Sequence, residues 1–103
     1  MSTSPTTPIG ITILHRSNLR EQTYDSRIRN IQAELLRQLD MQFGLDVSPE
    51  DRLAEHLLRV DDRERLSLIL CRHFPFLLSP MTLIEKSATF ADLITAIADQ
   101  VGA

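Results

Sequence analysis

The spacing of apolar residues predicts helices along most of this chain. Between Arg27 and Phe43, apolar side chains recur at intervals of three and four residues, which places them on one helix face. Ser26 is a candidate N-cap, and Gly44 stands where a left-handed C-terminal residue is expected. We therefore predict a first helix over 27–43 whose inner face carries Ile28, Ile31, Leu35 and Leu39.

Two serine-proline pairs predict short helices, because serine caps a helix and proline fits its first position. Ser48-Pro49 is followed by two acids, which favour the positive end of a helix dipole. We expect a turn or two there, with Leu53 and Leu57 directed inward. Ser79-Pro80 predicts a second short helix over 81–86.

A longer helix is predicted from Asp61 to Phe74. Asp61 and Glu64 have the spacing of a capping box, and Pro75 disfavours continuation. Leu68 and Cys71 fall on the side opposite the main apolar stripe, so this helix is apolar on two faces. The main stripe consists of Leu66, Ile69, Leu70, His73 and Phe74.

The last predicted helix begins at a second capping box, formed by Thr89 and Asp92. One face of this helix carries Phe90, Leu93, Ile94, Ile97 and Val101. Three amphipathic faces can close around one core, so we predict an all-α fold, a small bundle of three or four helices.

The first 25 residues follow a different pattern. Residues 1–8 are rich in proline and hydroxyl side chains, which predicts a disordered tail. Alternating isoleucines in 9–14 favour an extended segment, and the polar stretch 15–25 is typical of a linker. We therefore divide the chain into a flexible tail with an extended segment over 1–25 and a helical domain over 26–103.

Composition narrows the possible functions. A chain of 103 residues forms one domain, and its formal net charge of −3 argues against nucleic acid binding. A single cysteine, Cys71, excludes an internal disulfide framework and is compatible with a cytoplasmic protein. We expect no signal peptide and no membrane contact, since no apolar run approaches the ~20 residues that a membrane helix needs.

Residues that could carry chemistry are scattered. Cys71 and His73 resemble a nucleophile beside a base, but residues two apart on a helix point away from each other. His15 and His56 lack metal-ligand spacing with either of them. The acidic pairs Asp61–Asp62 and Asp51–Glu55 are explained by helix capping and the helix dipole. We expect no active site, no metal and no cofactor, and therefore not an enzyme.

Five arginines lie in or near the predicted helix 61–74: Arg52, Arg59, Arg63, Arg65 and Arg72. Acidic residues are interleaved with them, which favours a solvated face of mixed sign over a phosphate-binding stripe.

Over residues 27–101 the order of helices, the long loop and the apolar positions resemble the acyl carrier protein family. Leu66, Leu70 and Phe74 match that family's second helix. Thr89-Phe90 with Ile94 and Ile97 matches the start and inner face of its last helix. Ile28 with Ile31 fits its first helix, and Leu53 with Leu57 fits the apolar pair that closes its loop. The resemblance implies a four-helix carrier fold.

The family's attachment motif is missing. Carriers have Asp-Ser-Leu at the start of the second helix, where the serine bears the 4′-phosphopantetheine arm. The matching stretch here is Leu58–Arg65, which contains no serine, threonine or cysteine. Ser67 lies at least one turn deeper, so the resemblance does not assign the attachment role to it. The resemblance therefore implies a carrier-like fold without carrier chemistry.

The leading hypothesis is an acyl-carrier-like module that binds an unidentified protein partner without a covalent cofactor. We predict the partner-binding residues to be Glu64, Arg65, Leu68, Cys71 and Arg72. An alternative for this face is that residues 9–14 cover Leu68 and Cys71 within the monomer. Other functional alternatives are a genuine carrier modified at an unconventional serine such as Ser67, and, less favoured by the acidic composition, a helical DNA-binding regulator.

Overall fold

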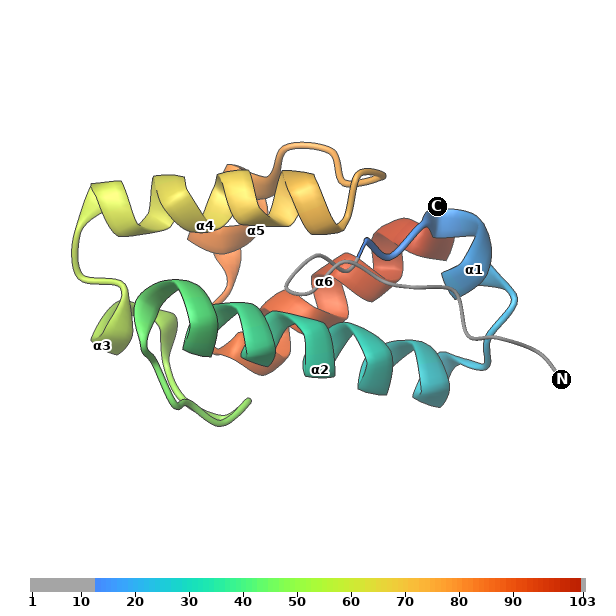
Figure 1. Ribbon diagram of the computed structural model, residues 1–103, viewed down its shortest axis with the longest axis horizontal. Helices are drawn as coiled ribbons and strands as arrows, with labels where there is room; N and C mark the ends of the chain where they lie inside the picture. The colour runs from blue at the N-terminus through green and yellow to red at the C-terminus, as the bar shows by residue number, and fades with distance from the viewer. Residues whose placement is uncertain (1–12, 103) are drawn as a thin grey trace, which may run out of the picture.

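The computed structural model describes residues 13–102, and every regular element in this range is a helix (Figure 1). The helices are α1 (Arg16–Arg20), α2 (Tyr24–Phe43), α3 (Leu53–His56), α4 (Val60–His73), α5 (Pro80–Lys86) and α6 (Phe90–Gly102). The all-α prediction is confirmed. The proposed tail 1–8 and most of the extended segment 9–14 lie outside the described residues.

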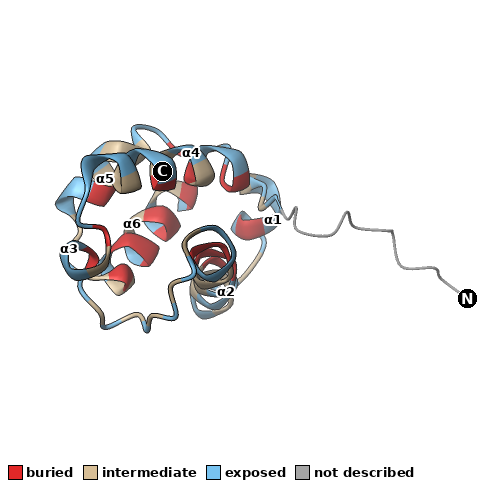
Figure 2. Ribbon diagram, turned by 60° about the vertical axis from the view of Figure 1, so that its left-hand side comes forward, coloured by how far each residue is buried: buried red, intermediate tan, exposed pale blue. Residues whose placement is uncertain are grey.

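Helix α6 occupies the centre of the molecule. It contacts α1, α2 and α5, and the buried residues of the surrounding helices face it (Figure 2). Its predicted inner face is confirmed, because Phe90, Leu93, Ile94, Ile97, Ala98 and Val101 are all buried. Burying a large apolar side chain contributes about 1.5–3 kcal/mol, so this helix supplies a large share of the core.

The capping box predicted at the start of α6 is present. The Asp92 backbone N–H donates to Thr89 Oγ1 at 3.1 Å, and the Thr89 N–H donates to Asp92 Oδ2 at 3.1 Å. The loop before α3 joins the same helix end, since the Phe90 N–H donates to the Asp51 carbonyl at 3.1 Å. The start of α6 is thereby held by its own side chains and by the long loop.

Helix α2 ends as predicted but begins earlier. Gly44 is left-handed, with φ +66°, and its N–H donates to the carbonyls of Leu39 and Asp40. The N-cap is Thr23 instead of Ser26, because Thr23 Oγ1 accepts the Ser26 N–H at 3.2 Å. Both residue types can cap a helix, and the backbone enters the helix at Thr23.

The linker predicted over 15–25 is wrong where α1 forms. Leu19, the apolar residue of this short helix, is fully buried in the core. The Arg27 Nε donates to the Leu19 carbonyl at 3.1 Å, and the Arg16 Nε donates to the Val101 carbonyl at 3.2 Å. The first part of the polar stretch, residues 16–19, is therefore bound to α2 and α6.

In the segment between α2 and α4 the predicted apolar contacts are confirmed, and the predicted helix start is wrong. Leu53 and Leu57 are buried, as predicted. Residues 48–51 form a turn in which the Ser48 N–H donates to Asp51 Oδ2 at 2.9 Å, so helix α3 begins only at Leu53.

Helix α4 begins at Val60, with Arg59 as an N-cap residue whose side chain makes no capping hydrogen bond. The capping box predicted from Asp61 to Glu64 is therefore wrong. Asp61 and Asp62 lie inside the first turn, where their charge still favours the positive end of the helix dipole. The predicted stop at Pro75 is confirmed, because Phe74 is the C-cap.

Helix α5 begins at Pro80, as the serine-proline pair predicts. Ser79 precedes it in a left-handed conformation, and its side chain makes no capping hydrogen bond. Among residues 13–102, no helix combines the length and the apolar character that crossing a bilayer requires.

Candidate partner-binding face

Helix α4 presents its apolar residues to two sides. Leu66, Leu70, His73 and Phe74 of the predicted stripe are buried, and Ile69 is half-buried. On the other side Leu68 is 70% exposed and Cys71 is exposed. Both faces of the sequence prediction are therefore seen in the structure, with the second face open to solvent.

The five predicted face residues all lie exposed on α4. They are Glu64, Arg65, Leu68, Cys71 and Arg72. With about 100° of rotation per residue, the five side chains cover an arc of roughly 120°. Val60, which is 55% exposed and was not among the predicted residues, lies about 20° beyond this arc, next to Cys71. Its spacing of four residues from Glu64 is the signal that could have identified it.

Arg65 is held in place by the end of α2. Its Nη2 donates to the Gln42 carbonyl at 2.9 Å, and its guanidinium carbon lies 4.6 Å from the centre of the Phe43 ring. A cation over an aromatic face is attracted by the ring quadrupole. The carbonyls at a helix C-terminus also favour a cation. The mixed-sign face predicted around the arginines therefore contains one arginine with a fixed orientation.

Two hollows flank Leu68, and they differ in charge. One, of about 170 Å³, is lined by Gln42, Arg65, Leu68, Ile69, Arg72 and His73. The other, of about 430 Å³, is lined by Glu64, Ser67, Leu68 and Met81. Leu68 is thus an apolar ridge between a hollow with two arginines and a hollow with a glutamate.

Cys71 and His73 do not form a nucleophile–base pair. Cys71 is exposed, whereas His73 is 3% exposed and contacts the core. The His73 Nδ1 lies 3.3 Å from Glu34 Oε2. The divergence predicted from their spacing is confirmed.

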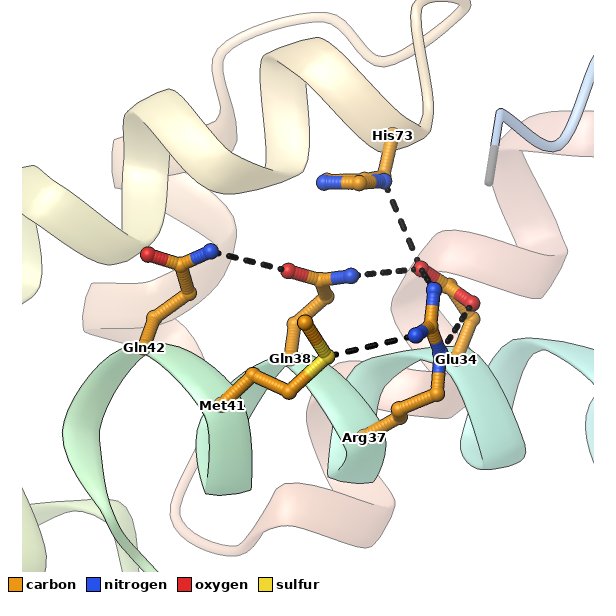
Figure 3. Close-up of polar contacts among 6 residues, drawn as sticks. All are labelled: Glu34, Arg37, Gln38, Met41, Gln42 and His73. Atoms are coloured by element: carbon orange, nitrogen blue, oxygen red, sulfur yellow. Dashed lines mark hydrogen bonds and ion pairs between the residues drawn. The ribbon is translucent and has the colours of Figure 1, made fainter. Parts of the chain in front are cut away.

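A buried polar cluster joins α2 to α4 and was not predicted (Figure 3). Glu34 and Gln38 lie on the inner side of α2 at 6% and 1% exposure. The Gln38 Nε2 donates to Glu34 Oε2 at 2.8 Å, and Arg37 Nε donates to Glu34 Oε1 at 3.3 Å. Positions 31, 34, 35 and 38 follow helical spacing, so these polar residues could have been recognised within the core stripe.

The polar groups of this cluster satisfy one another. Both carboxylate oxygens of Glu34 contact partners, and no buried side-chain nitrogen or oxygen among residues 13–102 lacks one. Buried polar groups with satisfied hydrogen bonds fix how elements pack. We therefore assign the cluster to the docking of α4 on α2.

The other candidate ligands are dispersed. In the described part of the chain, no three histidine, cysteine or acidic side chains converge as metal ligands would. His56 Nε2 lies 3.8 Å from Asp51 Oδ2, and His15 is exposed at the start of α1. The predicted acidic pairs therefore act at a turn, through Asp51, and in the first turn of α4, through Asp61 and Asp62.

Comparisons of the sequence with protein families and curated proteins, and of the fold with solved structures, find no significant match.

Proposed function

We propose that this chain is a non-catalytic, acyl-carrier-like helical module that acts by binding another protein, without covalent phosphopantetheine. The observation that carries the proposal is the exposed outer face of α4. A single exposed apolar residue is ordinary on a protein surface. Here Val60, Leu68 and Cys71 share one side of one helix, and Leu58, which is 74% exposed, lies directly before it.

The order of elements supports the carrier-like part of the proposal. The long helix α2, a nine-residue loop over 44–52, the short helix α3 and the long helix α4 come in an order that resembles the carrier family. Most residues that carried the resemblance are buried, and Ile28 is half-buried; the buried ones are Ile31, Leu53, Leu57, Leu66, Leu70, Phe74, Phe90, Ile94 and Ile97. The resemblance thus involves positions that determine the packing of the bundle.

The start of α4 supports the absence of the prosthetic arm. Carriers attach the arm through a serine hydroxyl at this helix start. The first turn here contains Val60, Asp61, Asp62 and Arg63, none of which has an alcohol group. The Arg63 Nη1 donates to the Leu57 carbonyl at 3.1 Å, so that side chain stabilises the entry into the helix.

Site-specific photocrosslinking tests the proposal. A photoreactive residue at position 68 is expected to give a discrete product in native cell extract. Position 33 is the matched control, because Ala33 is exposed on α2, away from α4. Excess wild-type protein is expected to suppress the product, and excess Leu68→Glu protein is not. Equal crosslinking from both positions, or none from position 68, would contradict protein binding at this face.

A second candidate is a genuine carrier modified at Ser67. The supporting observation is that Ser67 lines the 430 Å³ hollow with Leu68 and Met81, where an arm has room beside apolar side chains. Incubation with coenzyme A and a phosphopantetheinyl transferase, followed by intact mass measurement, tests it. A gain of about 340 Da that disappears in Ser67→Ala would establish modification. An unchanged mass would eliminate this candidate.

A further inference from the structure

We propose that the partner presents an acidic amphipathic helix to the hollow between Arg65 and Arg72. This inference rests on the proposed function and specifies the chemistry of the partner. The hollow lies along α4, with Leu68 and Ile69 between the two arginines and Gln42 of α2 on its rim. A mostly polar, cationic hollow that also exposes Leu68 is complementary to a helix that carries acidic residues around an apolar one.

The charges in this hollow are available for a partner. In the described range, no carboxylate lies within ion-pair distance of Arg65 or Arg72. Arg65 uses one donor on the Gln42 carbonyl, and the Phe43 ring fixes its orientation. A guanidinium has five N–H donors, so it can still bind a carboxylate. Because its orientation is already fixed, little side-chain entropy remains to be lost on binding.

The spacing of the arginines sets the spacing of the acids. Arg65 and Arg72 are seven residues apart, or two helical turns and about 10 Å along the axis. A partner helix with acids at positions i and i+7 can reach both. An apolar residue at i+3 or i+4 then packs on Leu68 and Ile69. Glu64 lies on the opposite side of Leu68, which disfavours a partner that is acidic on both edges.

The distribution of charge also argues against nucleic acid as the ligand of this hollow. A duplex nucleic acid needs a broad positive surface, whereas Glu64 and Asp61 are exposed on the same helix. The chain as a whole carries a formal net charge of −3. The local arginine pair is therefore better matched to two carboxylates than to a run of phosphates.

The probe is a synthetic helical peptide of 18 residues with Glu at i and i+7 and Leu at i+3 and i+4. The control peptide has Lys in place of both Glu residues. Backbone amide shifts of the full chain are recorded as each peptide is added. The Glu peptide is expected to shift residues 65–73 and Gln42 and to bind at least about tenfold more tightly than the Lys peptide.

Arg72→Glu is the variant of choice, because Arg72 is exposed and its loss leaves the Arg65 contacts with α2 in place. This substitution is expected to lower the affinity for the Glu peptide by about three- to tenfold. The Lys peptide should then bind Arg72→Glu more tightly than it binds wild type. Arg29→Glu, an exposed arginine of α2, is the charge-matched control and is expected to leave the affinity unchanged.

Several results would overturn the inference. These are equal binding of the two peptides, shifts confined to another face, no shifts at all, or an equal loss in Arg29→Glu. Displacement of the Glu peptide by a 12-base-pair DNA duplex that shifts the same residues would assign the hollow to nucleic acid. Crosslinking from position 68 separates this inference from the proposed function. If Arg72→Glu gives as much crosslinked product as wild type, the acidic partner is contradicted while protein binding at this face is still supported.

Discussion

Helices α4 and α6 are similar in length but use their apolar residues differently. In α6 the large apolar side chains face the centre of the molecule, and a complete capping box fixes the helix start. In α4 the inner stripe is buried while Val60 and Leu68 are exposed, and Arg59 at its start makes no side-chain cap. The contrast indicates that α6 serves stability and that the outer side of α4 is free to serve recognition.

The largest expected effect comes from shortening an inner residue of α6. Phe90 is fully buried at the start of the helix. Phe90→Ala removes its transfer free energy and leaves a cavity, so it should lower the free energy of unfolding by about 3–5 kcal/mol. Urea denaturation followed by circular dichroism measures this. A loss under about 1 kcal/mol would mean that α6 is not the centre of the core.

The next largest loss of stability is expected when the buried polar cluster between α2 and α4 is disrupted. Glu34→Ala removes the carboxylate that His73 and Gln38 contact, and a buried donor such as Gln38 Nε2 that loses its acceptor costs about 1–3 kcal/mol. We expect destabilisation in that range in thermal or urea unfolding. Glu85→Ala, an exposed acid of α5, is the control and should leave stability unchanged. Equal stability of the two variants would contradict the docking role.

Removing a helix-capping side chain should change the free energy of unfolding less, and it compares the starts of α6 and α4 directly. Thr89→Ala removes the side-chain cap of α6 and should cost about 1 kcal/mol. Asp61→Ala should cost less than about 0.5 kcal/mol, because Asp61 lies inside the first turn of α4 and caps nothing. A larger loss in Asp61→Ala than in Thr89→Ala would restore the capping box predicted from the sequence.

The smallest effect on stability is expected on the outer side of α4. Leu68→Ala should change the free energy of unfolding by no more than about 0.5 kcal/mol, since the side chain is 70% exposed. Loss of Leu68 should nevertheless weaken partner binding. Deletion of residues 1–12 in the same assay tests the alternative that 9–14 cover this face. A large loss in both variants would favour intramolecular cover.

Such a truncation has to stop before α1. Leu19 belongs to the core, so a deletion that reached residue 20 would destabilise the protein for an unrelated reason. Leu14 is half-buried, and its N–H donates to the His73 carbonyl at 2.8 Å. Ending the deletion at residue 12 preserves both contacts and keeps the comparison with Leu68→Ala clear.

Some features determined by local sequence were predicted correctly, although the N-cap at Ser26 and the capping box from Asp61 to Glu64 were not. Gly44 adopts a left-handed conformation that few other residues tolerate, and Thr89 with Asp92 satisfies two backbone donors within one turn. Apolar spacing likewise identified the buried positions of α6 and the inner stripe of α4. In each case the deciding interactions lie within a few residues of one another.

Features determined by distant contacts were missed. Leu19 is buried because α2 and α6 bind the backbone and side chains around it, which its polar neighbours did not indicate. Glu34 tolerates burial because His73 reaches it from α4, 39 positions along the chain. The predicted face was likewise incomplete. Its five residues are exposed on α4, but the contacts of Arg65 with Gln42 and Phe43 depend on how α4 packs on α2.

The contact of Arg65 with Gln42 and Phe43 has a consequence for how a ligand can bind. Arg65 joins the outer side of α4 to the final turn of α2, which Gly44 terminates. A carboxylate that binds other N–H donors of the Arg65 guanidinium leaves the hydrogen bond to the Gln42 carbonyl in place. The outer side of α4 can therefore be occupied while the end of α2 stays attached to it.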